Sequence, residues 1–150
     1  MNDNPSPALP DMSDEERTQK NKEILLATLK AIGAKRATVS YSGSGDEGYA
    51  DEVLIESQDG TAIEPATIVS LFSKDSVFVE RKWQVSTSIS EFPLAEALKS
   101  FAMSVLWLHH AGWENNDGGS GEVEFDPDGG EVCLHHNEYY TESNSFETVL

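Results

Sequence analysis

The clearest hydrophobic pattern in the chain lies between residues 94 and 108. Large apolar side chains repeat there at helical spacing, as Leu94, Leu98, Phe101, Val105 and Leu108. Alanine, methionine, leucine and tryptophan fill most of the remaining positions, so nearly the whole circumference is apolar. Helices of this kind are normally covered by protein on several sides. The pattern therefore predicts a buried helix at the centre of the core, beginning near Pro93 and ending before Gly112.

A second helix is predicted from residue 14 to about residue 32. Ser13 and Glu16 have the spacing of a capping box, in which the serine hydroxyl accepts a hydrogen bond from the Glu16 N–H. Gly33 follows as a left-handed stop. The first half is polar, and the second half carries an apolar stripe made of Leu25, Leu29 and Ile32. We expect an amphipathic helix on the surface of the body.

Four shorter segments alternate between apolar and polar residues and predict β-strands. They are residues 37–41, 49–57, 122–126 and 131–140. The last two are joined by Pro127-Asp-Gly-Gly130, which has the composition of a tight turn. Residues 60–90 suggest one or two more strands. The predicted fold class is α+β: an antiparallel sheet of about four strands with one buried helix across a face and an N-terminal amphipathic helix.

Three local features carry further expectations. The link between the first two strands, residues 42–48, contains three glycines and is expected to be a flexible acidic loop. Cys133 lies in the middle of the last strand and is expected to be a buried structural thiol. Residues 1–12 hold three prolines without apolar periodicity. They indicate a mobile tail before a single domain over residues 13–150.

The net charge of −17 comes from two stretches that contain no lysine or arginine. Residues 37–73 hold seven carboxylates and residues 100–150 hold ten. Such a chain repels the phosphates of nucleic acids and of anionic membranes, so we expect neither as a direct partner. The charge favours a basic protein surface or cations. The single cysteine and the polar N-terminus fit the reducing cytoplasm.

The predicted strand 122–126 places three carboxylates on one face. Glu122, Glu124 and Asp126 alternate with Val123 and Phe125, so the acids would project about 7 Å apart along the strand. A row of this kind can oppose arginine and lysine side chains on a partner and steer its approach. The simpler explanation is a solvated sheet face that keeps the protein soluble.

The segment Trp113-Glu-Asn-Asn-Asp-Gly-Gly119 puts four oxygen donors within four residues, as a hard cation needs. An EF-hand register fits in part, but Trp113 then takes the first position, where a carboxylate is required. A loop whose Asn and Asp side chains bond the local backbone is the simpler explanation.

The four histidines occur as two adjacent pairs. His109 and His110 end the buried helix, whereas His135 and His136 lie on the last strand, where neighbours point to opposite faces. A metal centre built from one helix histidine with His136 and Glu114 is sterically conceivable. Zinc would also favour a cysteine or a closely spaced histidine pair, and the sequence offers neither. We therefore expect no metal ion and no cofactor.

Three segments together resemble a known family: Tyr41-Ser-Gly-Ser-Gly-Asp46, Gly112-Trp-Glu-Asn-Asn-Asp-Gly-Gly119 and His136-Asn-Glu-Tyr-Tyr140. The family consists of small uncharacterised proteins encoded by bacteria, phages and plasmids, and is classed as a domain of unknown function. The resemblance implies a compact α+β domain and a mobile-element setting. It carries over no catalytic residues.

The sequence is consistent with two different functions. The first is a non-enzymatic acidic protein that binds a basic partner, for example a nucleic-acid-mimicking inhibitor of the anti-CRISPR or anti-restriction type that blocks a nucleic-acid-binding protein. Its binding residues would be Asp46, Glu47, Glu114, Asp117, Glu122, Glu124 and Asp126. The second is a small cation-dependent hydrolase, because clustered carboxylates can raise one pKa for acid–base chemistry. Its catalytic residues would be Asp46, Glu114, Asp117 and His136.

Overall fold

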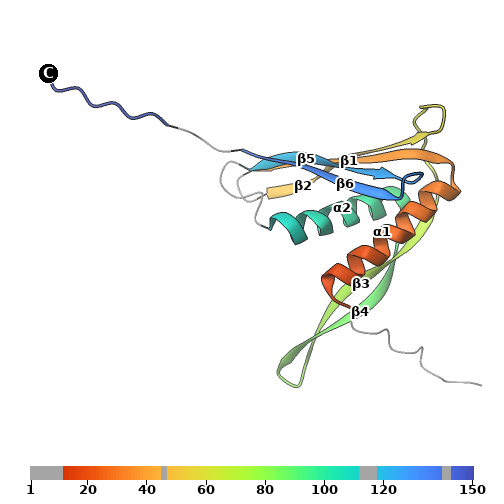
Figure 1. The fold of residues 1–150 in the computed structure, drawn as a ribbon. Helices are drawn as coiled ribbons and strands as arrows, with labels where there is room; N and C mark the ends of the chain where they lie inside the picture. Colours follow the sequence, from red (N-terminus) through yellow and green to blue (C-terminus); the bar gives the residue numbers. More distant parts are fainter. Residues whose placement is uncertain (1–11, 45–46, 112–117, 140–142) are drawn as a thin grey trace, which may run out of the picture.

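The computed structural model of the chain describes residues 12–44, 47–111, 118–139 and 143–150. In chain order its elements are α1 (Asp14–Ala31), β1 (Ala34–Ser44), β2 (Glu47–Ser57), β3 (Ile68–Val79), β4 (Lys82–Pro93), α2 (Leu94–His110), β5 (Gly119–Asp126) and β6 (Glu131–Glu138). Figure 1 shows a sheet lying over two helices, with a long hairpin that leaves the body.

Four strands form one antiparallel sheet in the order β2-β1-β5-β6. α2 packs against one face of this sheet, which we call the inner face, and α1 contacts α2, β1 and β3. This arrangement confirms the predicted α+β fold with a helix across the sheet. The largest fully buried side chains come from both layers and are Tyr41, Phe125, Leu25, Leu29, Leu94, Leu98, Leu106, Val39 and Val123.

Helix α1 begins where its capping sequence predicts. The Glu16 N–H donates to Ser13 Oγ at 3.1 Å, and Leu25 and Leu29 in the second half are fully buried. The polar first half differs from the expectation of a simple surface, because Arg17 and Asn21 are buried as well. Asn21 bonds the backbone at the base of the β3–β4 hairpin, whereas Arg17 donates to Asp14 and to the Met12 carbonyl.

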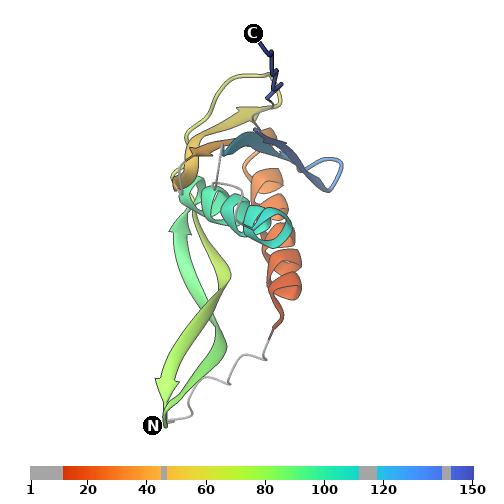
Figure 2. The same ribbon diagram turned by 90° about the vertical axis from the view of Figure 1, so that its left-hand side faces the viewer.

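β3 and β4 form a separate two-stranded sheet of twelve residues on each strand. In Figure 2 this hairpin extends away from the four-stranded sheet, and its base lies against the helices. Asn21 fastens that base, because its Nδ2 donates to the Phe72 carbonyl at 3.0 Å and its Oδ1 accepts from the Phe72 N–H at 2.8 Å. Beyond the base, apolar side chains are exposed, among them Phe78, Trp83, Val85 and Ile89.

Two local predictions are wrong. β1 and β2 stay paired as far as Ser44 and Glu47, so most of the glycine-rich segment 42–48 is strand rather than loop. Cys133 is exposed rather than buried. Val132 and Leu134 turn toward the helices and pack against the core, and strand alternation therefore leaves Cys133 on the opposite face of β6.

The two ends of the described chain lie in different places. Most of the predicted N-terminal tail, residues 1–11, lies outside the described residues, and the Met12 N–H donates to Thr87 Oγ1 of β4 at 3.3 Å. Residues 143–150 run away from the sheet as an exposed segment without regular secondary structure (Figure 1). In the part of the chain that the structure describes, no helix has both the length and the apolar character needed to cross a membrane.

Candidate functional site

A row of three residues crosses the sheet on its inner face near the end of α2. Tyr41 of β1 pairs with Gly121 of β5, and Gly121 pairs with His136 of β6. Strand alternation places Tyr41 and His136 on the face that packs against α2, in line with the buried Val39 and Val123. Because Gly121 has no side chain, the tyrosine reaches over β5, and its hydroxyl lies 2.5 Å from His136 Nδ1.

His136 is the centre of a small polar cluster. Its side chain is only 4% exposed. The imidazole of His110, at the end of α2, stacks on it with ring centroids 4.2 Å apart. The carboxylate of Glu138, two residues further along β6, lies 3.4 Å from His136 Nε2 and 3.7 Å from His110 Nδ1. We refer to His110, His136 and Glu138 as the histidine cluster.

The surroundings of the histidine cluster lower the pKa of His136 and raise that of Tyr41. Burial lowers the pKa of His136, the nearby His110 lowers it further, and Glu138 acts in the opposite sense. Burial also raises the pKa of Tyr41 to about 12. His136 is thereby favoured as a neutral imidazole and Tyr41 as a neutral phenol at ordinary pH. A neutral imidazole can act as a base or as a metal ligand.

The opposite face of the sheet carries a group of glutamates. Val123 and Phe125 are fully buried, so Glu122 and Glu124 lie on the outer face of β5. Two glutamates of β2 stand on the other side of β1. Together they line a shallow hollow of about 370 Å³, which we call the acidic hollow; its lining residues are Arg36, Thr38, Ser40, Glu52, Leu54, Glu56, Glu122 and Glu124.

Arg36 is the basic side chain among the residues that line the acidic hollow. Its guanidinium lies 3.2 Å from a Glu56 oxygen and 3.5 Å from a Glu124 oxygen, and these carboxylates raise the pKa of Arg36. His135, on the outer face of β6, lies 4.0 Å from Glu124. Glu52 and Glu122 flank Ser40 from both sides. One end of the hollow is therefore partly neutralised, and the other end is anionic.

The predicted site residues have different fates. Asp46, Glu114 and Asp117 lie outside the described residues, and for Glu47 the structure describes only the backbone. Glu122 and Glu124 line the acidic hollow. Asp126 does not belong to it, because its Oδ1 accepts the Gly129 N–H at 3.0 Å and stabilises the turn between β5 and β6.

His136, the remaining predicted catalytic residue, lies in the histidine cluster. Sequence reasoning missed its contacts with Tyr41 and Glu138. The spacing of His136 and Glu138 was a usable signal, since residues two apart on a strand share a face. The contribution of Tyr41 could not be found in this way, because it depends on the pairing of β1, β5 and β6.

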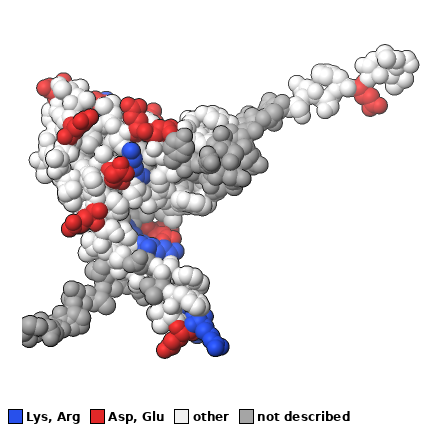
Figure 3. Space-filling view, turned by 180° about the vertical axis from the view of Figure 1, so that it is seen from behind, with Lys and Arg blue, Asp and Glu red and all other residues white. Residues whose placement is uncertain are grey.

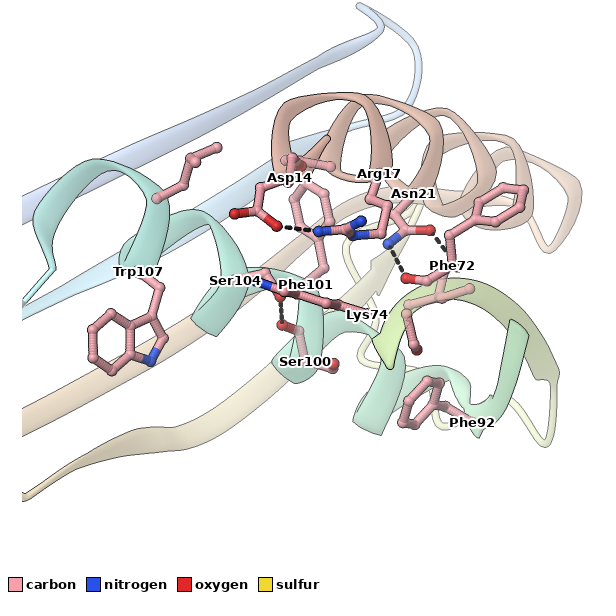
Figure 4. A pocket seen from close by; sticks show the side chains of 14 residues that line it. Asp14, Arg17, Asn21, Phe72, Lys74, Phe92, Ser100, Phe101, Ser104 and Trp107 are labelled. Atoms are coloured by element: carbon pink, nitrogen blue, oxygen red, sulfur yellow. Dashed lines mark hydrogen bonds and ion pairs between the residues drawn. The ribbon is translucent and has the colours of Figure 1, made fainter. Parts of the chain in front are cut away.

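A larger groove of about 580 Å³ lies between α1, α2 and β3 and is shown in Figure 4. Its wall includes the rings of Phe92 and Trp107. The buried polar side chains in it are engaged within the chain: Arg17 donates to Asp14 and to a main-chain carbonyl, and Asn21 bonds the backbone of β3. These bonds, drawn as dashed lines for Asp14 and Asn21, tie the two buried polar side chains of the groove to the chain itself.

Comparison with known proteins gives one result. A family model described as a family of unknown function (DUF6878) matches residues 17–150, which include both the histidine cluster and the acidic hollow. No curated protein and no solved structure matches the chain.

Proposed function

The chain belongs to this family of unknown function, and we propose that it is a non-enzymatic binding protein that captures a basic protein partner through the acidic hollow. The observation that supports the proposal is the placement of four glutamates around one hollow on the outer sheet face. Two come from β2 and two from β5, so residues 70 positions apart in the chain act together.

The arrangement suits electrostatic capture. Glu52 and Glu122 flank Ser40 at the end of the hollow that Arg36 does not neutralise, so a partner's arginine or lysine can lie between them. The charges outside the hollow have the same sign on balance, so they steer a cationic partner from a distance. Figure 3 shows one side of the molecule, on which acidic side chains are distributed over the body and basic ones are few.

A specific version of this function is a protein that imitates the phosphates of a nucleic acid and blocks a nucleic-acid-binding protein. An inhibitor of the anti-CRISPR or anti-restriction type, carried by a mobile element and acting in the cytoplasm, would use such a surface. The exposed Cys133 would stay a thiol in that compartment.

The test places a photo-crosslinking residue at Thr38, in the centre of the acidic hollow, and identifies the cross-linked protein in a bacterial lysate. Binding of that protein is then measured with the purified chain at several salt concentrations. Affinity should fall steeply as salt rises, because charge interactions between exposed groups are screened. Glu122→Lys with Glu124→Lys should slow association more than it speeds dissociation.

The matched control carries the same change of charge elsewhere. Glu23→Lys with Glu91→Lys reverses two exposed carboxylates on α1 and β4, outside the hollow. This variant should keep most of the association rate. Equal losses in both double variants would mean that only net charge matters, and unchanged binding in the hollow variant would refute the proposal.

A further inference from the structure

The histidine cluster presents three ligand atoms to a common point. One nitrogen each from His110 and His136 and one oxygen from Glu138 all lie within 4.8 Å of one another. The two contacts to the glutamate oxygen measure 3.4 and 3.7 Å. In a tetrahedral zinc site with bonds of about 2.0–2.1 Å, neighbouring ligand atoms are about 3.3 Å apart. The two measured contacts are close to that spacing, and rotation of the partly exposed His110 and Glu138 side chains can adjust them around the fixed His136 ring.

The donor set selects the class of metal. Two imidazoles and one carboxylate suit zinc and other borderline divalent ions, whereas calcium and magnesium prefer sites made entirely of oxygen. Three protein ligands leave one position of a tetrahedron open for water or another ligand. Glu138 is 62% exposed and His110 is 37% exposed, so an ion can enter from solvent without unfolding the chain.

Tyr41 supplies the outer support that metal-binding histidines commonly have. A histidine that binds a metal through one ring nitrogen usually hydrogen-bonds through the other, which fixes the ring and its tautomer. With its proton on Nδ1, His136 donates to the Tyr41 oxygen 2.5 Å away. The lone pair of Nε2 then faces Glu138. Tyr41 is 2% exposed and packed in the core, so the position of the His136 ring is set before any metal arrives.

We propose that His110, His136 and Glu138 bind one zinc ion, with Tyr41 as a positioning residue. The sequence predicts no metal because it lacks a closely spaced ligand pair; here the ligands come from the end of α2 and from one face of β6. Among the described residues this is the one group of three such ligands close enough to share an ion. The site lies on the inner face of the sheet, so it stands independently of the acidic hollow.

The test is calorimetric titration of the metal-free full chain with zinc alone, beside a titration with magnesium. We expect one zinc per chain, bound at least about a hundredfold more tightly than magnesium. Cobalt should give the strong visible absorption of a tetrahedral site. Because the His136 side chain is buried, the decisive variants are His110→Gln, at a partly exposed position, and Glu138→Gln, at an exposed one. Each should weaken zinc binding by at least about tenfold, and Tyr41→Phe should weaken it by about tenfold.

The neighbouring residues provide matched controls. His109→Gln and His135→Gln remove histidines outside the cluster, and Glu131→Gln removes an exposed glutamate at the other end of β6. These three should keep wild-type zinc affinity. Zinc that binds no more tightly than magnesium would overturn the proposal, since attraction to the net charge would explain it. Wild-type affinity in both His110→Gln and Glu138→Gln would overturn it as well.

Discussion

The hydroxyl of Tyr41 on β1 reaches Nδ1 of His136 on β6 across the whole width of the intervening strand β5. The two residues are 95 positions apart in the chain. Their contact exists because the residue between them in the register is Gly121. The imidazole of His136 is therefore held by three features together: the buried position of Tyr41, the register of β1, β5 and β6, and the lack of a side chain at Gly121.

Replacement of Gly121 by alanine should be strongly destabilising. The added methyl group would overlap the backbone carbonyl of His135 and the hydroxyl of Tyr41, and the backbone atom cannot move aside cheaply. We expect a loss of about 1–3 kcal/mol in the free energy of unfolding, measured in urea. Gly129→Ala is the control, because its methyl would meet only the exposed carboxylate end of Asp126. Similar losses in both variants would contradict the prediction.

Tyr41 should make the fold sensitive to alkaline pH. Its pKa is raised to about 12 in the folded state against 10.0 for an ordinary tyrosine. The stabilising effect is therefore complete below pH 10 and is lost as the pH rises toward 12, by at most about 2–3 kcal/mol. In urea titrations between pH 9 and 12, Tyr41→Phe should show a shallower fall than wild type. Tyr139→Phe, at an exposed tyrosine, should fall like wild type; an equally shallow fall there would count against the explanation.

Asn21→Ala should loosen the base of the hairpin. The change removes both hydrogen bonds to the backbone of Phe72 and leaves those groups without their partner in a partly buried place. We expect a loss of about 1–3 kcal/mol in unfolding free energy. Amide exchange at Phe72 should become faster than in wild type. Asn137→Ala, at an exposed position of β6, serves as the comparison. Unchanged exchange at Phe72 would show that apolar contacts alone hold the hairpin.

Arg36→Gln should strengthen capture of a basic partner. The substitution removes the cation that lies between Glu56 and Glu124, so the acidic hollow becomes more negative. Stability should change little, because both ion pairs are partly exposed. Association, followed by stopped-flow fluorescence, should become faster at low salt. Lys99→Gln removes the same charge from a pair with Glu96 on α2 and should have a much smaller effect. Slower association of the Arg36 variant would be the opposite of what the proposal requires.

The regular parts of the fold could be predicted because each depends on local chemistry. The cap at Ser13, the apolar repeat of α2 and the alternation of Val123 and Phe125 with glutamates all act within a few residues. The β3–β4 hairpin was predicted only as one or two strands within residues 60–90, without bounds, because Trp83 and Ile89 are exposed. Its strands therefore lack the one-sided burial that makes a strand recognisable in a sequence.

The candidate sites were predictable only in part. Glu122 and Glu124 follow from strand alternation, but their position opposite Glu52 depends on which strands are neighbours. Arg36 lies just before residues 37–73, which contain no lysine or arginine. Only the pairing of β1 with β2 and β5 brings it between Glu56 and Glu124. The histidine cluster likewise needs the end of a helix to meet a strand that follows it in the chain. Such juxtapositions are properties of topology, which a single sequence records only indirectly.

The projecting β3–β4 hairpin should affect how readily the protein associates with itself in solution. Residues 68–93 hold three acids and three bases, so the chain's net charge of −17 resides outside the hairpin. Each molecule is thus a polyanion that carries a neutral arm, and among the described residues β3 and β4 pair with no strand other than each other. At low ionic strength, charge repulsion between two molecules keeps their hairpins apart. Added salt reduces the range of that repulsion to about 8 Å near physiological concentrations. Rising salt should therefore release a basic partner and at the same time drive the free protein toward self-association, so that light scattering increases as binding decreases.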